Sequence, residues 1–312
     1  MQRREFLRLL ALAAAAGASL RTGQSAAQAV DELYAAPRFG NVSLLHFTDC
    51  HAQLLPTYFR EPNVNIGVAT AAGKPPHLVG DAMLRHFGIT AGSRQAHAFT
   101  HLDFEHAALR YGKIGGFAHL APLVKRLRAE RPHALLLDGG DTWQGSAVSL
   151  WTKGADMIGA QKLLGVDLMT AHWEFTYGAE RMKQAVDKEL GGMEFLAQNV
   201  KTTDFEDPVF KPYSLRTVNG VPLAIIGQAF PYTPIANPRH MVPDWTFGIQ
   251  ETRLQRLVEE VRGKGAHLVV LLSHNGMDVD LKLAGRVRGI DLILGGHTHD
   301  GVPAPVVVGN GG

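Results

Sequence analysis

Short apolar runs that end in polar turns are the main pattern along the chain. A run of about four to eight apolar residues between turn residues is typical of a buried strand. Five such runs lead into Asp or His: Val42–Phe47 into Thr48-Asp49-Cys50-His51, Ala134–Leu137 into Gly139-Gly140-Asp141-Thr142, Val166–Thr170 into Ala171-His172-Trp173-Glu174, Leu268–Leu272 into Ser273-His274-Asn275-Gly276, and Asp291–Leu294 into Gly295-Gly296-His297-Thr298-His299. Since open α/β sheets place their chemistry at the carboxyl ends of strands, we expect these turns to form one site.

Asp141 stands out among these polar residues because two flexible glycines precede it at the end of a predicted strand. A carboxylate has two oxygens and can bridge two cations, which makes Asp141 a candidate shared metal ligand. The alternative for this residue alone is a cap of the following helix. Five turns of the same kind favour the metal site.

Helical spacing of apolar residues separates the predicted strands. The predicted helices are Ala118–Glu130, Asp156–Leu164, Ala179–Leu190, Gln250–Arg262 and Val279–Val287, and two further strand candidates are Val221–Ile226 and Pro305–Val308. Alternating strands and helices are typical of an α/β fold whose sheet layers are covered by helices.

The pattern is weakest between Leu54 and Arg110, where Pro, Gly, His and Thr follow one another with little periodicity. A connection of this length is unusual inside a compact domain, and long loops are commonly lids, binding loops or mobile segments. Five histidines fall in this insert, and none follows a predicted strand. We therefore expect them on the surface or at helix caps: His77, His86, His97, His101 and His106.

The amino terminus has the pattern of an export signal. Arg3-Arg4 begins a twin-arginine pattern, an apolar stretch without acidic residues follows from Leu9 to Leu20, and Ala27-Gln28-Ala29 resembles a cleavage site. We expect residues 1–29 to be removed, residues 30–40 to form a linker, and the mature protein to reach the periplasm. An ordinary secretion signal is the alternative and leads to the same compartment.

The net charge limits the kinds of partner the protein can bind, and the cysteine content limits what can stabilise its fold. Loss of residues 1–29 removes four arginines and one glutamate, so the formal charge of +2 becomes −1. A nearly neutral chain without a basic block argues against nucleic acid or anionic lipid as a partner. Cys50 is the single cysteine, so an internal disulfide is excluded and the apolar core must supply the stability.

The ordered motifs of this chain resemble those of the calcineurin-like metallophosphoesterases, in their 5′-nucleotidase branch. The resemblance runs from about Val42 to Asp300 and rests on Asp49-Cys50-His51, Gly140-Asp141, His172-Trp173-Glu174, Ser273-His274 and Gly295-Gly296-His297-Thr298-His299. It implies a two-sheet sandwich flanked by helices, with two divalent cations at the carboxyl ends of the strands. It also implies the ligands, namely Asp49, His51, Asp141 and His299 for one cation, and Asp141, His172, His274 and His297 for the other. Such mixed carboxylate and imidazole ligands suit manganese, zinc or iron better than calcium. Among these metals we expect manganese.

The third motif departs from that of the nucleotidase branch, which ordinarily reads Gly-Asn-His-Glu-Phe-Asp. Here His172 takes the ligand position, Trp173 replaces the histidine that stabilises charge on phosphate, and Thr176 replaces the aspartate that supports this histidine. Losing one such donor costs roughly 10²–10³ in rate, which argues against a nucleotide phosphate as substrate. Trp173 then either forms a wall of the pocket or packs in the core.

The altered motif resembles one subgroup of the branch, the SoxB thiosulfohydrolases of the Sox sulfur-oxidation system. This resemblance implies release of sulfate from a cysteine S-thiosulfonate carried by the SoxYZ protein, with Asp141, His172 and Trp173 at the reacting centre. A periplasmic 5′-nucleotidase-like phosphoesterase is the second possibility. A catalytically inert metal-binding or carrier-docking protein is the third.

Several single residues have a structural interpretation beside the functional one. Trp143 and Tyr177 are expected to pack or to line a channel, and Glu174 to support a ligand or begin a helix. Cys50 should point away from the cations because its neighbours point toward them. His297 and His299 would face opposite sides of a regular strand, so both reach one site only from a turn.

The carboxyl end reads as a strand that enters a turn, with Pro305–Val308 followed by Gly309-Asn310-Gly311-Gly312. We therefore expect the metallophosphoesterase domain to span 41–312, with an insert at about 54–110. We also expect that a C-terminal domain of the family is missing from this sequence.

Overall fold

The computed structural model describes residues 39–58, 60–62 and 67–309, so the predicted signal at 1–29 lies outside the described residues. The chain divides into two compact units. The larger unit contains residues 41–57 and 114–298, and the other contains residues 58–113 and 299–308. The domain boundaries inferred from the sequence remain a prediction.

The first sheet of the larger unit is parallel and has the strand order β1-β2-β3-β4. Its strands are β1 (Leu44–Phe47), β2 (Leu135–Asp138), β3 (Leu168–Met169) and β4 (Glu194–Phe195). The turns that carry Asp49, Asp141 and His172 follow β1, β2 and β3, so one edge of this sheet presents three of the predicted ligand turns.

The second sheet has the order β10-β9-β7-β6, in which only β6 runs antiparallel to its neighbour. Its strands are β6 (Tyr213–Val218), β7 (Val221–Gln228), β9 (Leu268–Ser273) and β10 (Leu292–Leu294). A separate two-stranded ribbon pairs β5 (Lys201–Thr202) with β8 (Trp245–Thr246). Asn219 and Gly220 join β6 to β7 with positive φ at both residues, as tight hairpin turns require.

Alternating side chains of the strands supply the core on both faces of each sheet. Leu137 faces the cluster between the sheets together with Ile225 and Val270, whereas Leu136 faces the cluster on the outer side of the first sheet. In β9, Val269 and Leu271 likewise turn outward. The period of two therefore makes a sandwich, with an apolar layer between the sheets and another on each outer face.

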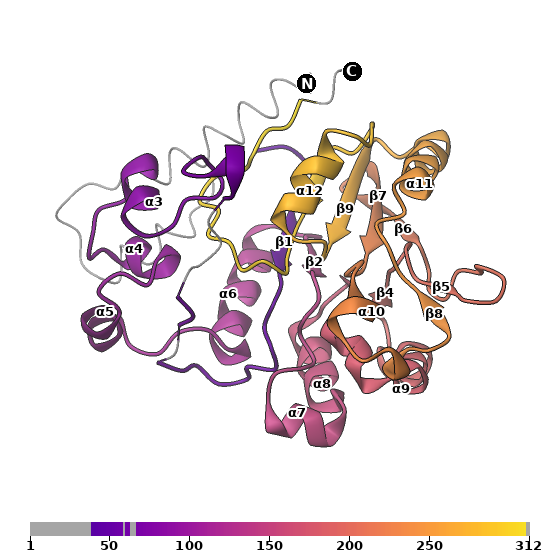
Figure 1. Ribbon diagram of the computed structural model, residues 1–312, viewed down its shortest axis with the longest axis horizontal. Helices are drawn as coiled ribbons and strands as arrows, with labels where there is room; N and C mark the ends of the chain where they lie inside the picture. Colours follow the sequence, from indigo (N-terminus) through magenta and orange to yellow (C-terminus); the bar gives the residue numbers. More distant parts are fainter. Residues whose placement is uncertain (1–38, 59, 63–66, 310–312) are drawn as a thin grey trace. The chain divides into compact units, whose positions relative to one another are not determined.

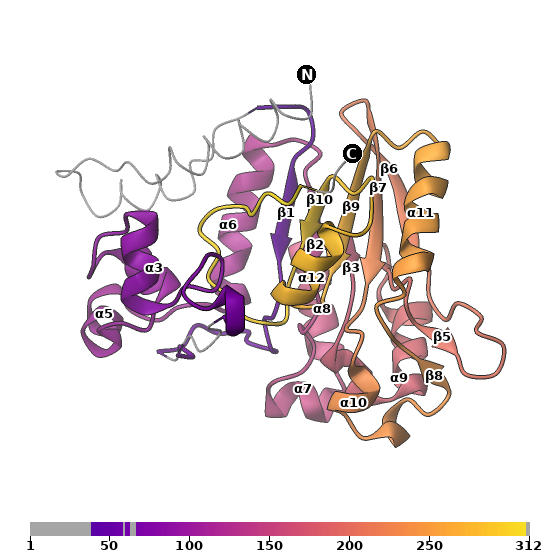
Figure 2. The same ribbon diagram turned by 45° about the horizontal axis from the view of Figure 1, so that its top comes forward.

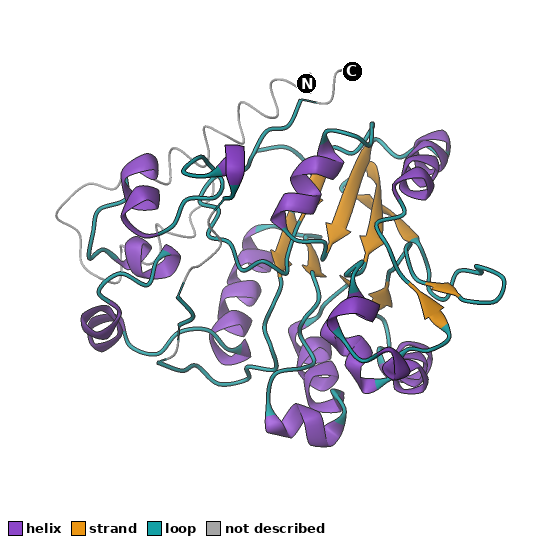
Figure 3. Cartoon of the chain, viewed as in Figure 1, coloured by secondary structure: helices purple, strands orange, loops and turns teal. Residues whose placement is uncertain are grey.

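Helices cover the two outer faces (Figures 1 and 2). On the first sheet α6 (Phe117–Glu130) and α8 (Ala155–Leu164) pack through apolar residues, and on the second sheet α11 (Glu251–Gly263) and α12 (Met277–Ala284) do the same. The remaining helical segments of this unit are α7 (Ala147–Thr152), η2 (Trp173–Tyr177), α9 (Ala179–Gln184), the π-helical η3 (Ala185–Glu189), α10 (Thr233–Ala236) and η4 (Arg239–Met241). The layers, which Figure 3 shows by element type, confirm the predicted α/β sandwich.

In each sheet, a carboxylate at the amino end of one strand binds the backbone of the neighbouring strand and an arginine of a covering helix. Asp167 accepts from Leu136 N at 2.7 Å and from Arg128 Nη2 at 2.5 Å. In the other half Asp291 accepts from Val269 N at 2.8 Å and pairs with Arg262. Both carboxylates lie at strand ends opposite to the ligand turns, so they stabilise the sheets away from the predicted site.

The smaller unit contains helices where the sequence led us to expect an irregular loop, and that expectation was wrong. Its elements are η1 (Ala69–Ala71), α3 (Gly80–Phe87), α4 (Arg94–Phe99) and α5 (Phe104–Tyr111). Leu84, Ile89 and Ala96 form a small core beside Phe87 and Phe99. The helices are short, and two of them begin without a side-chain cap, which explains why the sequence signal is weak.

His97 also contradicts the expectation that the histidines of this region lie on the surface. It is buried, and its ring stacks on Tyr111 with the ring centroids 5.6 Å apart. Burial, together with the charges of Arg60 and Arg94, lowers the pKa of His97. By contrast, His106 is exposed and binds Asp103.

The segment near the carboxyl end differs from the prediction. Residues 305–308 have no regular secondary structure, so the strand predicted there is wrong. Without cross-strand partners, a run of three valines is not enough to form a strand.

Among the described residues, none of the helices has the length and apolar character needed to cross a membrane.

Candidate metal centre

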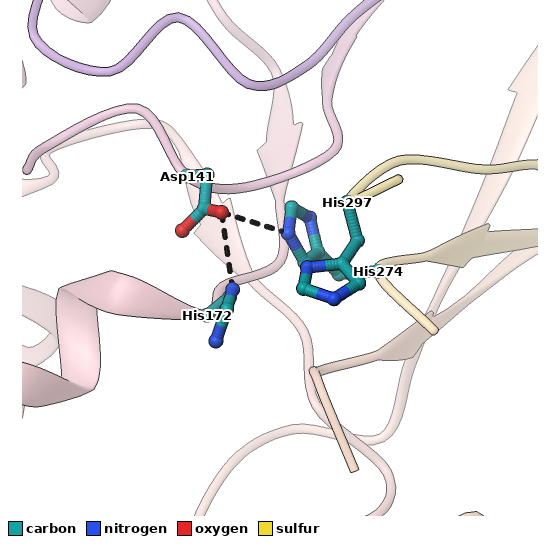
Figure 4. A group of neighbouring side chains, drawn as sticks. All are labelled: Asp141, His172, His274 and His297. Atoms are coloured by element: carbon teal, nitrogen blue, oxygen red, sulfur yellow. Dashed lines mark hydrogen bonds and ion pairs between the residues drawn. The ribbon is translucent and has the colours of Figure 1, made fainter. Parts of the chain in front are cut away.

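One carboxylate and three imidazoles meet where the turns of the two sheets converge (Figure 4). Asp141, His172, His274 and His297 each offer a ligand atom, and these atoms all lie within 4.8 Å of one another. Asp141 Oδ2 is 3.0 Å from His172 Nδ1 and 3.1 Å from His274 Nε2. Asp141, His172 and His274 are buried, so the structure brings the four side chains of one predicted ligand set together in a largely buried site.

Left-handed backbone conformations aim these ligands. Asp49, Asp141 and His297 have φ values of 54°, 56° and 81°, which residues other than glycine seldom adopt. Such conformations cluster at functional sites, where the surrounding contacts hold them. The segment after β10 is a turn and not a strand, as the sequence predicted for His297 and His299.

Asp49 and His51 lie beside the Asp141 group in the same unit. His51 Nε2 is 4.0 Å from both Asp49 Oδ1 and Asp141 Oδ2. The Asp49 carboxylate accepts hydrogen bonds from Thr48 Oγ1 at 2.6 Å and from His297 N at 3.0 Å. These two residues therefore stand where a second cation could share Asp141 with the first.

His299 belongs to the smaller unit, unlike the other six predicted ligands. There its Nδ1 lies 2.8 Å from Glu61 Oε2. Its role beside Asp49 and His51 remains a prediction that rests on the family resemblance.

Hydrogen bonds around the imidazoles fit a site for cations. His274 Nδ1 donates to Gly139 O at 2.6 Å, so Nε2, which faces Asp141, is the ring nitrogen that could bind a cation once it loses its proton. Metal-binding histidines are commonly fixed in this way through their second ring nitrogen. His172 Nε2 is buried and has no hydrogen-bond partner among the described residues. A site of imidazoles and carboxylates suits manganese, zinc or iron.

Charge inside the site is arranged around Asp141. Burial raises its pKa, but hydrogen bonds from His172 and His274 outweigh burial and hold the pKa well below its ordinary value. Burial lowers the pKa of His274, yet the bond to Asp141 and the charge of Asp49 raise it to about 9. Burial and the two neighbouring histidines lower the pKa of His297 to about 4. In the metal-free protein a protonated His274 thus partly neutralises the carboxylates.

We predict that cation binding releases protons near neutral pH. A cation needs the free lone pair of His274, which is protonated below about pH 9 when no cation is bound. Cation affinity should therefore increase with pH up to about 9 and then level off. Manganese added to the chelator-treated protein at about pH 7.5 should acidify a weakly buffered solution by about one proton per site. Release that stays the same at about pH 7.5 and at about pH 10 would contradict this prediction.

Trp173 does not pack in the core and lies beside two of the predicted ligands. Its side chain is 40% exposed, and the ring centroid lies 6.0 Å from that of His172 and 6.1 Å from that of His51. The backbone N–H of Trp173 donates to Asp141 Oδ1 at 2.8 Å. Thr176 Oγ1 donates to Trp173 O at 2.6 Å, so this hydroxyl stabilises the turn.

The other aromatic and sulfur side chains near the motifs are structural. Trp143 is 1% exposed and donates from Nε1 to Gln161 at 2.6 Å, while Tyr177 donates to Trp143 O at 3.0 Å. Cys50 packs against the apolar cluster outside the first sheet, and burial raises the pKa of its thiol. The Cys50 thiol therefore packs with apolar side chains.

Phe230 is a residue of the site that the sequence did not reveal. It follows β7, is 6% exposed, and its ring centroid lies 3.9 Å from that of His172 and 4.2 Å from that of His297. The phenyl ring thus fixes two of the three imidazoles from one side. The signal available in the sequence was its place after an apolar run, which lacked the Asp or His that marked the other turns.

Replacing Phe230 by Leu should weaken cation binding about tenfold, as loss of other supporting contacts does, because both imidazoles gain freedom. Phe210→Leu is the matched control, since Phe210 is 7% exposed and packs on Phe195 and Trp245 in the core. Both variants should lose about 1 kcal/mol of stability, and only the first should lose affinity. Manganese titration with thermal unfolding separates the two, and equal affinities would refute the role of Phe230.

Comparisons with known proteins agree with this geometry. No family model matches the chain. The rat 5′-nucleotidase is 32% identical over 194 residues, which are 60% of this chain and 33% of that protein, and the bovine 5′-nucleotidase is 31% identical over 192 residues with the same coverage. The chain thus spans about a third of the length of these curated relatives.

Solved structures of related proteins resemble this chain in fold. The sulfate thiohydrolase SoxB of Thermus thermophilus, solved with glycerol, is 41% identical with a TM-score of 0.84 over 88% of this chain and 51% of that chain. The NAD nucleotidase of Haemophilus influenzae is 22% identical with a TM-score of 0.58, over 83% of this chain and 38% of its own, and supports the fold alone. The chain spans about half of the SoxB chain that it matches.

Proposed function

We propose that this chain is a metal-dependent thiosulfohydrolase, because it is similar to 5′-nucleotidases in sequence and to SoxB in sequence and structure. Its substrate is a cysteine S-thiosulfonate on the SoxYZ carrier protein. Water attacks the terminal sulfonate sulfur, an S–O bond forms, and the bond to the neighbouring sulfur breaks. Sulfate and a proton leave, and a cysteine persulfide remains on the carrier.

The observation that carries this proposal is the half-exposed indole of Trp173 beside His51 and His172. In the nucleotidase branch that this chain resembles, a histidine that stabilises charge on phosphate takes the position of Trp173. A phosphate monoester carries nearly two negative charges at neutral pH, whereas a terminal sulfonate carries one. A site with a neutral indole in place of an imidazole therefore suits the sulfonate better. A persulfide is also a good leaving group, so the reaction places little demand on a general acid.

The residues of the chain divide the work of the site. Asp141, His172, His274 and His297 would hold one cation. The family resemblance implies that Asp49, His51, Asp141 and His299 would hold the other. Cations held there would supply a water molecule of lowered pKa and would neutralise the oxygens of the group under attack. Gly139 O orients His274 and the backbone of Trp173 orients Asp141, while the indole shields this side of the site from water.

The sequence supports the setting in which this reaction takes place. The twin-arginine pattern at Arg3-Arg4 supports export of the folded protein to the periplasm, where the SoxYZ carrier would meet it. Manganese is the cation we expect, because the ligand set joins carboxylates to imidazoles; zinc and iron fit the same set.

A periplasmic 5′-nucleotidase-like phosphoesterase is the alternative, and the identity to mammalian 5′-nucleotidases favours it. The two functions differ in the anion that is released. The test is sulfate release from a carrier protein with a cysteine S-thiosulfonate, measured beside phosphate release from AMP, with manganese-loaded protein. Sulfate without phosphate supports the proposal. Phosphate without sulfate refutes it and requires another donor in place of the missing histidine.

A further inference from the structure

Glu174 is completely buried at the centre of the site and accepts four backbone hydrogen bonds. Its Oε1 accepts from Thr142 N at 2.7 Å and from Trp143 N at 3.2 Å. Its Oε2 accepts from His172 N at 2.8 Å and from Asp141 N at 3.3 Å. A carboxylate offers about four lone-pair sites, and here backbone N–H groups use all of them.

These bonds join two turns that are distant in sequence. Three of the donors belong to the turn after β2, 31 to 33 residues before Glu174, and the fourth belongs to the turn after β3. Each turn carries a predicted ligand, Asp141 in one and His172 in the other. Within the described part of the chain, Glu174 has no ion pair with a basic side chain. Its charge is thus balanced by the backbone of the two turns.

Two other buried carboxylates near the site, Asp138 and Asp280, do not join two ligand-bearing turns. Asp138 accepts from Gly140 N and Thr142 Oγ1 in the turn after β2, both at 2.9 Å, and from Gln161 Nε2 of α8. Asp280 accepts from Ser273 Oγ at 2.8 Å and Asn275 Nδ2 at 2.9 Å, on either side of His274. Glu174 differs from both because it connects two ligand-bearing turns.

A simpler interpretation is that Glu174 caps the short helix η2. That interpretation explains the bond to His172 N, which lies at the start of this helix. It leaves the other three bonds without a reason, since helix capping does not require contacts with residues 141–143.

We propose that Glu174 is a positioning residue that fixes the Asp141 turn against the His172 turn. This contact lets one oxygen of Asp141 face both His172 and His274 before a cation binds. The inference rests on the metal dependence in the proposed function, and it is independent of the sulfur substrate. Glu174 touches neither the substrate nor a cation and acts through the two ligands.

Glutamine is the informative substitution because it keeps the shape and changes the chemistry. Its amide has one acceptor oxygen, and its NH2 group would face backbone N–H donors. Hydrogen bonds to an ionised acceptor are about twice as strong as neutral ones. Loss of groups that orient metal ligands weakens metal binding by roughly 10–100-fold, so we expect this range for Glu174→Gln.

The experiment compares Glu174→Gln with Asp167→Asn in the full chain, by manganese titration and by thermal unfolding of the metal-free protein. Asp167 also accepts a backbone N–H, but at the opposite end of the strands. Both variants should unfold at lower temperature, and only Glu174→Gln should bind manganese more weakly and change the manganese electron paramagnetic resonance spectrum. Unchanged affinity in Glu174→Gln, or equal losses in both variants, would overturn the inference.

Amide hydrogen exchange in the unsubstituted chain tests the same inference if Glu174→Gln does not fold. The amides of Thr142, Trp143 and His172 should exchange only with global unfolding, even without metal. Rapid exchange of these amides would overturn the role of Glu174. Neither measurement uses substrate, so a chain that lacks sulfate release can still support this inference while the proposed function fails.

Discussion

Asp141→Asn should abolish binding of at least one cation and reduce hydrolysis by roughly 10³-fold, the upper end of the range for loss of one group that stabilises the transition state. The carboxylate is 2% exposed, lies at hydrogen-bond distance from two imidazoles, and is 4.0 Å from His51. An amide keeps the shape but removes the negative charge that the cations require. It also presents an NH2 group to one side of the pair of histidines.

Metal content after dialysis, followed by hydrolysis at saturating manganese, measures both effects. Asp167→Asn is the control because it removes a structural carboxylate from the same sheet and leaves the ligand turns intact. An Asp141→Asn protein that retains two cations and most of its activity would show that Asp141 is not shared between them. Activity restored by excess manganese would instead place the defect in cation affinity alone.

The sequence predicted an α/β fold because short apolar runs that end in polar turns alternate with helical patterns, and the family resemblance added the two-sheet sandwich. The segments before Asp49, Asp141, His172 and His274 form strands in the structure, and the ligand turns lie at their carboxyl ends. The family resemblance drawn from these motifs is confirmed by the likeness to SoxB and to the 5′-nucleotidases. Local pattern was sufficient here, since a buried parallel strand needs a continuous apolar run.

Elements that depend on distant contacts could not be predicted in this way. Helices α3, α4 and α5 are short, and their small core becomes visible only when residues between Leu84 and Phe99 are packed together. Strand β6 alternates weakly, although Asn219-Gly220 is a strong hairpin signal that would have revealed it.

The contacts around the predicted ligands could be foreseen from the sequence only in part. Phe230 contacts His172 across 58 residues, and Glu174 accepts from Thr142 N across 32 residues, separations that follow from the residue numbers. Ligands are recognisable by residue type and position after a strand. Phe230 is an ordinary phenylalanine, and its place beside two predicted ligands arises only from the fold. The sequence predicted that Glu174 supports a ligand or begins a helix, but not its bonds to the turn after β2.

Gly296→Ala should damage the site nearly as severely as the loss of a ligand. A Cβ atom at this position would lie 2.4 Å from Thr48 Oγ1, 2.9 Å from Asp49 Oδ2 and 3.2 Å from His274 Nδ1. None of the three can move without cost, because Thr48 binds Asp49, Asp49 binds His297 N, and His274 binds Gly139 O. We expect a loss of about 1–3 kcal/mol in stability, as overpacked cores show, and at least tenfold weaker cation binding.

Gly159→Ala provides the opposite case on the same scaffold. Gly159 lies inside α8, and a Cβ atom there would meet nothing within 4 Å. Alanine favours a helix interior over glycine by about 0.5–1 kcal/mol, so this variant should unfold at a higher temperature and bind manganese normally. If Gly296→Ala also keeps normal manganese affinity, the turn after β10 must be able to shift away from Asp49. The close approach of the two turns would then be a packing feature, and the cations would not depend on it.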